Sequence, residues 1–243
     1  MVSTNQANLS LENLYNNRYS FTSSFWREYD NYYISLAAQG TDLWKKHRFN
    51  RLTASNFGSA LELGARYPNS SPMDVALDIT GIKPKVFSNF SLNVMAHGTK
   101  KEPIARKWYE DTYGVIVDEL GVVIPKFEIR IGASLDGSIR GTNGMIEIKC
   151  PKKMYPKLSQ HDPESVTDQF YHDHISEHHY AQMQGGMEIC NKDYCEYIVF
   201  ATESDQVYVE RVLRNQDYWK NILYPGINHF LTDIMEPLLS DKC

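Results

Sequence analysis

The chain has 243 residues, of which 42% are hydrophobic and 23% are charged, and its formal net charge is −5. This composition is that of an ordinary soluble globular protein with enough residues to bury a sizeable core. No apolar run approaches the roughly 20 residues of a membrane helix, and the polar N-terminus lacks the apolar core of a signal peptide. We therefore expect no membrane association and an intracellular protein, cytoplasmic or in a host nucleus, that is not secreted.

The cysteines are scattered without zinc-ligand spacing, so we expect reduced thiols. The charge is distributed unevenly along the chain. Residues 44–109 carry 11 Lys and Arg against 4 Asp and Glu, whereas residues 161–243 carry 5 against 15. A concentrated basic segment on an acidic body suits a protein that engages phosphates along one face. Chance segregation of solvated charges is the alternative.

The first 43 residues contain a cluster of aromatic side chains. The spacing of Phe25, Tyr29, Tyr32 and Tyr33, with charges between them, predicts an amphipathic helix packed against the main body. Stacking of these rings on bases is a second use of the same residues.

A basic segment follows, in which Lys45, Lys46, Arg48 and Arg51 precede Leu-Thr-Ala-Ser at 52–55. Thr53 or Ser55 is expected to cap a short helix through Phe57, Ala60 and Leu61. A helix N-terminus beside arginine side chains is a phosphate-binding arrangement, and a plain basic cap is the alternative.

The next two predicted helices are residues 73–80 and the segment after Gly98 up to residue 113. In the second helix Ile104, Ala105, Trp108 and Tyr109 share a face, and Pro103 is tolerable because it lies in the first turn. Glu102 lies in the same turn, and on these grounds alone it is a partner of the helix dipole.

Residues 115–125 and 127–135 alternate apolar and polar side chains, which predicts a hairpin whose second strand delivers Ser134 and Asp136. A third strand, 145–150, follows several turn-forming glycines. Alternation along this strand places Glu147 and Lys149 on one face, with isoleucines on the other.

We expect residues 129–135 to pair with 145–150, so that Asp136 and Glu147 converge. Converging carboxylates suit Mg²⁺, and Lys149 beside them can orient or deprotonate a water or stabilise negative charge. An Asp-Gly turn and a surface Glu-x-Lys pair are the alternative. The apolar surroundings, which indicate a buried strand, favour the metal site.

The pattern Ser134-x-Asp136-Gly137 followed by Glu147-x-Lys149-Cys150-Pro151 resembles the active site of the PD-(D/E)XK nucleases. It is most similar to the phage lambda exonuclease-like (YqaJ-type) viral recombination nucleases, over about residues 44–200. This resemblance implies a mixed α/β (α+β) fold with a restriction-endonuclease-like αβββαβ core, in which helices flank a central mixed sheet. We add an N-terminal helical layer and expect one nuclease domain over 1–243, with an N-terminal extension (1–43), a catalytic core (44–213) and a C-terminal helix (214–243).

The remaining elements complete this plan. Lys152, Lys153 and Lys157 follow the metal strand, where substrate phosphates would pass. The polar segment 159–179 contains His172, His174, His178 and His179, for which a polar loop and helix start is favoured over a zinc site. A helix over 178–190 carries a buried stripe, strands 194–201 and 206–213 close the sheet, and a final amphipathic helix covers 216–239.

The resemblance also implies roles for individual residues. It makes Glu102 a third acidic residue near the metals, the Ile148 carbonyl a metal ligand, and Gln182 a contact of the substrate or of the waters. In the family motif Tyr-x-x-Gln-x-Gln the tyrosine lies three residues before the first glutamine, whereas Tyr180 lies two before Gln182. The resemblance further implies that Arg48 and Ser55 bind a terminal 5′-phosphate. We group Ser134, Arg51 and Lys152 with them as substrate-binding residues.

These implications lead to a functional prediction. The chain is expected to be a Mg²⁺-dependent 5′→3′ exonuclease, with Mn²⁺ as a substitute, that degrades one strand of double-stranded DNA from a 5′-phosphorylated end. Viral or phage recombination, a strand-annealing protein partner and a trimer rest on family analogy, and a monomer is equally compatible with the sequence. An endonuclease or nickase on the same core, or a catalytically weak DNA-end-binding module, are the alternatives.

Overall fold

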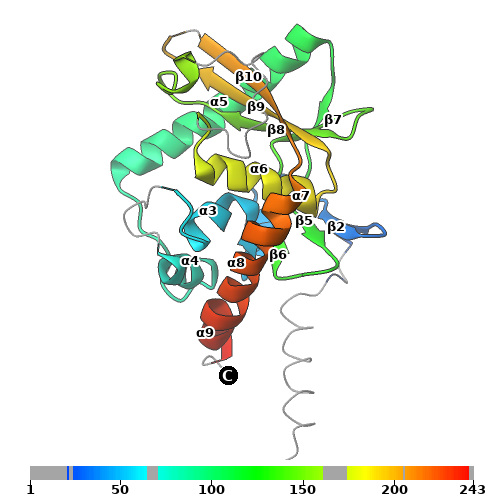
Figure 1. Cartoon of the computed structure of the whole chain (residues 1–243), viewed down its shortest axis with the longest axis vertical. Helices are drawn as coiled ribbons and strands as arrows, with labels where there is room; N and C mark the ends of the chain where they lie inside the picture. The colour runs from blue at the N-terminus through cyan, green and yellow to red at the C-terminus, as the bar shows by residue number, and fades with distance from the viewer. Residues whose placement is uncertain (1–20, 22–23, 65–70, 161–173, 205, 241–243) are drawn as a thin grey trace, which may run out of the picture.

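A five-stranded mixed sheet forms the centre of the molecule, with strand order β10-β9-β8-β7-β4 (Figure 1). The structure is a computed structural model that describes residues 21, 24–64, 71–160, 174–204 and 206–240. Strands β8 and β9 are parallel, and the other neighbours are antiparallel. The strands are β4 (Val117–Asp118), β7 (Gly137–Ile139), β8 (Gly144–Lys149), β9 (Tyr194–Ala201) and β10 (Gln206–Leu213).

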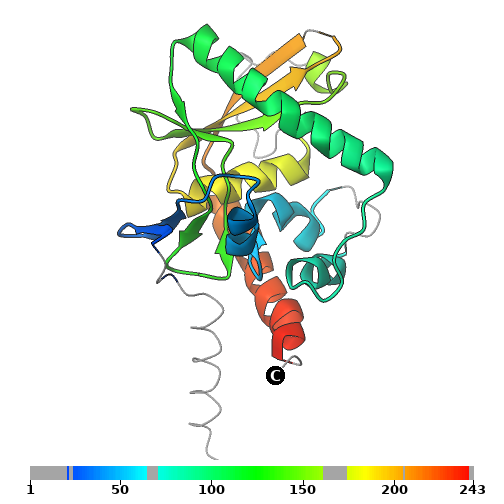
Figure 2. The same ribbon diagram turned by 180° about the vertical axis from the view of Figure 1, so that it is seen from behind.

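Two helices cover opposite faces of this sheet (Figures 1 and 2). Helix α5 (Asn89–Tyr113) packs Ala105 and Tyr109 against the face that carries Ile146, Ile148 and Ile198. Helix α6 (Glu177–Ile189) packs its methionines against the face of Met145 and Tyr197. The order α5-β4-β7-β8-α6-β9 is the predicted αβββαβ core, and the mixed α+β fold is confirmed.

Helix α5 is longer than the sequence indicated, because it begins at Asn89 and not after Gly98. Ser88 caps it by accepting a hydrogen bond from the Ser91 amide at 3.1 Å. Pro103 therefore lies inside the helix, where it removes one backbone hydrogen bond. The early start was missed because Phe90, Leu92 and Val94 leave much of their side chains exposed, so no buried stripe marks this part of the helix.

The predicted N-terminal helical layer is wrong for residues 26–35, which form two strands. Strands β1 (Trp26–Glu28) and β2 (Tyr32–Ser35) make a hairpin that extends through β5 (Val123–Pro125) into a three-stranded antiparallel sheet. Aromatic residues satisfy helical spacing and also favour strands, and pairing with β5 decides for the strand. Most of the first 23 residues lie outside the described part of the chain.

The predicted hairpin between residues 115–125 and 127–135 is also wrong in its pairing. Strand β4 joins the main sheet, β5 pairs with β2, and β6 (Ile131–Gly132) pairs in parallel with β3 (Leu52–Thr53). A bridge between Val123 and Ala133 is what remains of the expected contact. The alternating pattern identifies strands but not their partners, which are far away in the sequence.

Short helices lie between the N-terminal hairpin and α5. They are α2 (Asp42–Arg48), α3 (Phe57–Ala60) and α4 (Pro72–Ile79), and a 3₁₀ turn over Ala54–Asn56 leads into α3. Thr53 stands at the N-cap of that turn without a side-chain capping bond, so its predicted position is confirmed while the bond is absent. Ser71 and Asp74 form a capping box at α4.

The C-terminal segment is helical throughout its described length. It consists of α7 (Gln216–Tyr218), α8 (Tyr224–His229) and α9 (Glu236–Ser240), joined by π-helical turns over Trp219–Leu223 and Phe230–Met235. In Figure 1 it runs away from the sheet towards the C-terminus. Within the described ranges, every helix is too short or too polar to cross a bilayer.

Candidate active site

Strand β8 carries a carboxylate and an ammonium group side by side. Lys149 Nζ donates a hydrogen bond to Glu147 Oε1 at 2.6 Å, and only 2% of the Glu147 surface is exposed. The two side chains share the α6 face of the sheet, as the strand alternation predicted, while Ile146 and Ile148 join the opposite core. A buried carboxylate next to a lysine needs further partners, because an unpaired charge in the interior is costly.

Gln182 on α6 supplies one such partner. Its Nε2 donates to Glu147 Oε1 at 2.7 Å, and its Oε1 accepts from Lys149 Nζ at 3.1 Å. The three side chains thus form a closed hydrogen-bonded triangle. Burial alone lowers the pKa of Lys149, but the negative charges of Glu147 and Asp136 outweigh it and raise that pKa, so the lysine is an ammonium ion at neutral pH.

Asp136 approaches the same end of the sheet from the neighbouring strand. Its Oδ2 accepts a hydrogen bond from the Ile148 amide at 2.6 Å. The segment that pairs with β8 is β7, immediately after Asp136, with Gly137 opposite Ile146, so the expected pairing through residues 129–135 is wrong. The two carboxylates nevertheless converge. Burial, and next the charge of Glu147, raise the pKa of Asp136 to about 7.

Glu102 reaches this group from α5. Arg106, one helical turn later, donates to Glu102 Oε1 at 2.8 Å and also binds Glu119. Burial, followed by the charge of Asp136, raises the pKa of Glu102 to about 7. Two carboxyl groups whose pKa values are raised, first by burial and then by the charge of a neighbouring carboxylate, are typical of functional sites.

The donor chemistry of this cluster fits a hard divalent cation, since carboxylate and carbonyl oxygens are the ligands that Mg²⁺ prefers. Asp136, Glu147 and the Ile148 carbonyl belong to two adjacent strands, and Glu102 faces them from α5. Among the described residues, no three His, Cys, Asp or Glu side chains are already gathered around one point. Glu147 is engaged by Lys149 and Gln182, and Glu102 by Arg106.

A second polar cluster surrounds Arg48 at the end of α2. Its Nη1 donates to Ser134 Oγ at 2.9 Å, and its Nη2 donates to Thr53 Oγ1 at 3.0 Å and to Ser55 Oγ at 3.2 Å. The guanidinium carbon lies 4.4 Å from the centroid of the Trp44 ring, a cation–π distance. The structure thus brings together Arg48, Ser55 and Ser134. Of these, Ser134 lies two residues before Asp136.

Two of the predicted substrate-binding residues are not part of this cluster. Arg51 is buried, and its guanidinium donates to the backbone carbonyls of Ile129 at 3.0 Å and His47 at 2.8 Å, so it ties α2 to the segment before β6. Lys152 is exposed and forms an ion pair with Glu203 at 3.2 Å. Arg51 meets Arg48 through the backbone, where its amide donates to the Arg48 carbonyl at 3.1 Å, and its guanidinium bonds point to the other two carbonyls.

Sequence reasoning missed several residues that shape the site. Thr53 was considered only as a helix cap, although it lies in the Leu-Thr-Ala-Ser segment that supplies Ser55. Arg106, four positions after Glu102, has the spacing of a helical ion pair, which was the available signal. Glu119 had no such signal.

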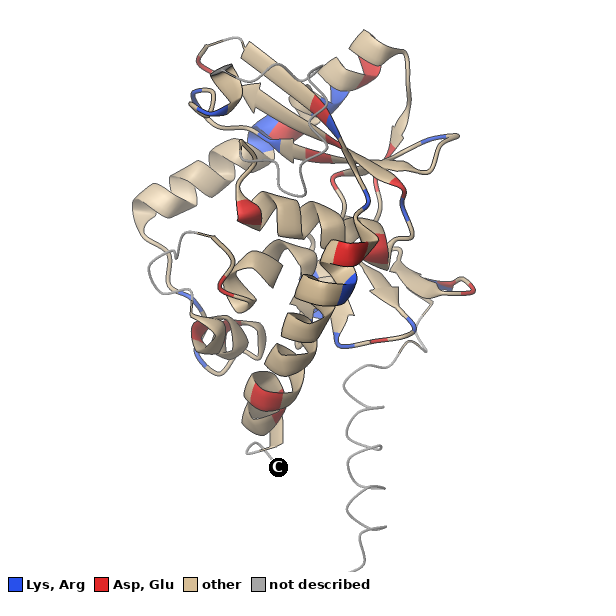
Figure 3. Ribbon diagram, in the orientation of Figure 1, with Lys and Arg blue, Asp and Glu red and all other residues tan. Residues whose placement is uncertain are grey.

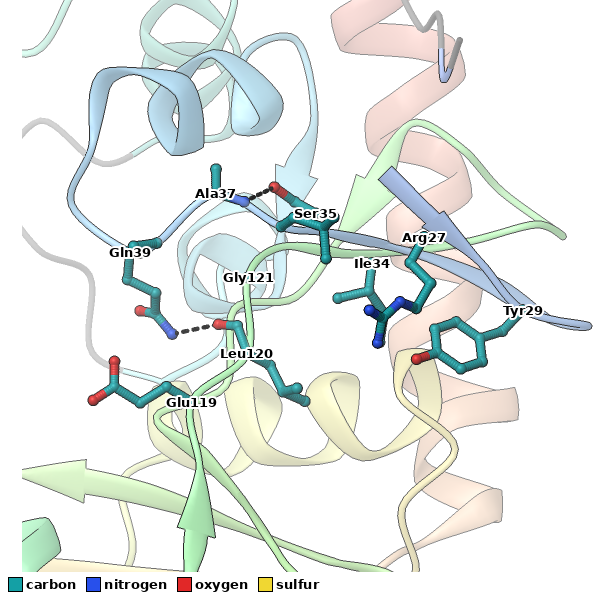
Figure 4. A pocket seen from close by; sticks show the side chains of 11 residues that line it. Arg27, Tyr29, Ile34, Ser35, Ala37, Gln39, Glu119, Leu120 and Gly121 are labelled. Atoms are coloured by element: carbon teal, nitrogen blue, oxygen red, sulfur yellow. Dashed lines mark hydrogen bonds between the residues drawn. The ribbon is translucent and has the colours of Figure 1, made fainter. Parts of the chain in front are cut away.

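A pocket of about 360 Å³ includes Glu119, the carboxylate that Arg106 also binds (Figure 4). Arg27 and Tyr29 of the N-terminal hairpin line one side of it, and Gln39 and Glu119 line the other. Gln39 Nε2 donates to the carbonyl of Leu120 at 3.1 Å and to that of Leu135 at 2.6 Å, which anchors the backbone just before Asp136.

The histidine-rich segment shows no zinc site within its described part. His174 pairs with Glu210 at 2.6 Å and His179 with the Tyr197 hydroxyl at 2.7 Å, so both are engaged in separate contacts. His172 lies outside the described residues. In Figure 3 basic segments occur at several places in the fold, among them α5 and the loop after β8.

A mixed sheet that presents an aspartate, a glutamate and a lysine from adjacent strands defines the PD-(D/E)XK class. The chain belongs to the family described as the YqaJ-like viral recombinase domain, whose family model matches residues 43–193.

Solved structures of exonucleases share the fold. LHK-Exo in complex with dAMP is 24% identical, with a TM-score of 0.64, over 83% of this chain and 96% of that chain. An alkaline exonuclease (LHK-Exo) from Laribacter hongkongensis is 22% identical, with a TM-score of 0.62 and the same 83% and 96% coverage. A phage-related exonuclease from Haemophilus somnus 129PT is 14% identical, with a TM-score of 0.52, over 79% and 96%. No curated protein matches the chain.

Proposed function

We propose that this protein is a metal-dependent 5′→3′ exonuclease that degrades one strand of double-stranded DNA from a 5′-phosphorylated end. The observation that carries the proposal is the joint placement of two clusters. Asp136, Glu147, Lys149 and Gln182 meet at the end of β8, and the Arg48 cluster joins them through Ser134, two residues before Asp136.

Asp136, Glu147 and the Ile148 carbonyl would hold one or two Mg²⁺ ions, with Glu102 as a further carboxylate. Bound there, Mg²⁺ would stabilise charge on the phosphate and lower the pKa of a water. The carboxyl groups would bind the cation in their deprotonated form. Because two such carboxylates repel each other, a cation between them is favoured. Mn²⁺ has the same preference for oxygen ligands and is proposed as a substitute.

Lys149 is suited to one of the roles expected from the sequence. An ammonium ion has no lone pair, so Lys149 donates hydrogen bonds that position the attacking water and stabilise developing negative charge. It does not deprotonate the water while its pKa is raised. Gln182 holds Lys149 and Glu147 in place and faces the same space.

The Arg48 cluster supplies the preference for the end. A guanidinium fixed by three hydroxyl groups and an aromatic face is suited to bind a phosphate with two parallel hydrogen bonds. A terminal 5′-phosphate held here would place the next phosphodiester at the carboxylates. The phosphate left after each cut would rebind, which accounts for a 5′→3′ direction.

The experiment uses linear duplexes of one sequence with a 5′-phosphate, a 5′-hydroxyl or a blocked 5′ end, together with a closed circular DNA, in Mg²⁺. Mononucleotides from the phosphorylated end, with the circle intact, are the expected result. Nicking of the circle without any effect of the 5′ end would establish an endonuclease instead. No cleavage with Mg²⁺ or Mn²⁺ would leave a DNA-end-binding module.

The biological setting stays a proposal that rests on the family resemblance. It comprises intracellular viral or phage recombination, a strand-annealing protein as partner and a trimeric assembly.

A further inference from the structure

We propose that a cavity beside Lys149, lined by Tyr155, His179 and Tyr197, binds the base of the second nucleotide, on the 3′ side of the cleaved phosphate. This inference rests on the proposed nuclease function and adds to it a contact with the nucleobase. The cavity has a volume of about 350 Å³, within the range of small-molecule sites. Pro156, Lys157 and His174 complete much of its lining.

The cavity adjoins the candidate active site through two elements. On β9, Tyr197 stands directly opposite Glu147 of β8, so their side chains emerge on the same face of the sheet. On α6, His179 lies three residues before Gln182 and therefore on the same side of the helix. His179 Nδ1 is 2.7 Å from the Tyr197 hydroxyl, which joins the two elements at the cavity wall.

The position of the cavity indicates which nucleotide it would receive. In the main sheet β8 lies between β7 and β9. Ser134 and the Arg48 cluster are on the β7 side, because Ser134 is in the segment that leads into β7, whereas Tyr197 is on β9. A strand whose 5′-phosphate is at Arg48 and whose next phosphate is at Glu147 would continue towards β9. Its second base would then reach the cavity.

The lining suits the flat face of a base. The rings of Tyr155 and His179 have centroids 6.0 Å apart, and those of His179 and Tyr197 are 5.8 Å apart. Tyr197 is only 1% exposed and supports His179 from below, so Tyr155 and His179 are the rings on which a base would stack. Bases stack on such rings without regard to their identity. Burial, and next the charge of Lys149, lower the pKa of His179 to about 3. Its imidazole is therefore neutral at physiological pH, so no charge on this ring loses its water when a base binds.

The far wall is held in place by a separate set of contacts. His174 Nε2 lies 2.6 Å from Glu210 Oε2, and the Tyr208 hydroxyl donates to the same oxygen at 2.5 Å. Lys157 is exposed at the rim, where a cation can approach the backbone of a bound strand. The cavity thus combines an aromatic interior with a basic edge, which is the combination that single-stranded DNA sites use.

The test pairs a change in the protein with a change in the substrate. The substrates are 5′-phosphorylated duplexes of one sequence that are intact, or that carry a tetrahydrofuran abasic nucleotide at the second or at the fifth position of the degraded strand. Release of the first nucleotide is measured in single turnover with Mg²⁺. The proteins are wild type, Tyr155→Ala, Tyr155→Phe and His179→Ala, with His229→Ala as a matched control because His229 is exposed on α8.

We expect the abasic second nucleotide to slow wild type by about tenfold, as for the loss of one stacked base. On the intact duplex, Tyr155→Ala and His179→Ala should release the first nucleotide about tenfold more slowly than wild type. For these two variants, the abasic second nucleotide should lower that rate by less than about a further twofold. Tyr155→Phe, which keeps the ring, should lose less than Tyr155→Ala and keep the sensitivity to the second abasic nucleotide. His229→Ala should behave as wild type, and the fifth position should have little effect.

Two results would overturn the pocket assignment: no effect of the second abasic nucleotide on wild type, or equal sensitivity in wild type and both alanine variants. If wild type cleaves none of the duplexes, the proposed nuclease function fails instead. Affinity for the intact and second-position abasic duplexes in Ca²⁺ then tests the cavity alone, and equal affinities for wild type would overturn it.

Discussion

The Arg48 guanidinium donates a hydrogen bond to Ser134 Oγ at 2.9 Å, although 86 positions separate the two residues in the sequence. This contact joins the end of α2 to the segment that delivers Asp136, two residues further on. A phosphate bound by Arg48, as proposed, would thereby be held at a fixed distance from the carboxylates. In the proposed function, the end preference and the cutting site would thus depend on one connected structure.

Replacing Arg48 by alanine should remove the preference for a phosphorylated end. Hydrogen bonds to charged groups contribute about 1.5–3 kcal/mol, so cleavage of the 5′-phosphorylated duplex is expected to fall by about 10- to 100-fold in kcat/KM. Cleavage of the 5′-hydroxyl duplex should change little. Arg140→Ala, which removes an exposed arginine paired with Asp118, is the matched control. An equal loss on both duplexes would contradict the assignment.

Replacing Lys149 by methionine should reduce both activity and stability. Loss of a preorganised charge at a reacting phosphate costs about 10²- to 10³-fold in kcat. Glu147 would remain buried without its cation, which destabilises a fold by about 3–5 kcal/mol. Urea unfolding of Lys149→Met and of the double variant Glu147→Gln/Lys149→Met separates these effects. The double variant should be more stable than Lys149→Met but remain inactive. A double variant as unstable as Lys149→Met would refute the ion pair between Glu147 and Lys149.

The metal-free protein should become less stable as the pH rises from about 4 to 7. Asp136 and Glu102 have pKa values of about 7 in the fold, above the ordinary 3.8 and 4.5, so in this window the folded state binds more protons than the unfolded state. Asp136→Asn should weaken this dependence and add about 1–2 kcal/mol at pH 8, less than the full shift because the carboxyl groups of Asp136, Glu147 and Glu102 titrate together.

The measurement is urea unfolding in EDTA at pH 5 and pH 8. Asparagine keeps an oxygen that accepts from the Ile148 amide, so the variant isolates the charge. Wild-type activity in Mg²⁺ should rise through pH 7, since the ligands must be deprotonated. An identical pH dependence of stability in both proteins would show that Asp136 does not titrate there.

Pro103→Ala should stabilise the protein. Pro103 is exposed inside α5, where a proline costs about 3 kcal/mol relative to alanine in a regular helix. A gain of about 1–3 kcal/mol in urea unfolding is expected. Because Pro103 follows Glu102, activity reports whether the proline helps to position that carboxylate. An unchanged or lower stability would indicate that the surrounding packing requires the proline.

Part of the site is determined by spacing along single elements. The alternation of β8 places Glu147 and Lys149 together, and it excludes Ile146 and Ile148 from that face whatever the rest of the fold does. On α6, the buried methionines likewise determine which side of the helix packs on the sheet, and Gln182 next to them reaches Glu147. Local periodicity is sufficient here because it depends only on backbone geometry.

Other features depended on contacts between distant segments, which no local pattern encodes. Residues 26–35 became strands because β5 offered an edge to pair with, and Asp136 met the Ile148 amide through β7 and not through the strand expected from the alternation. Arg48 and Arg51 lie in the same basic segment of the sequence. The guanidinium of Arg51 donates to backbone carbonyls, whereas that of Arg48 donates to a cluster of hydroxyl groups. The sequence alone thus determined the class of fold and the residues of β8 and α6, whereas the tertiary structure decided strand partners and which cation is available, because these depend on long-range packing.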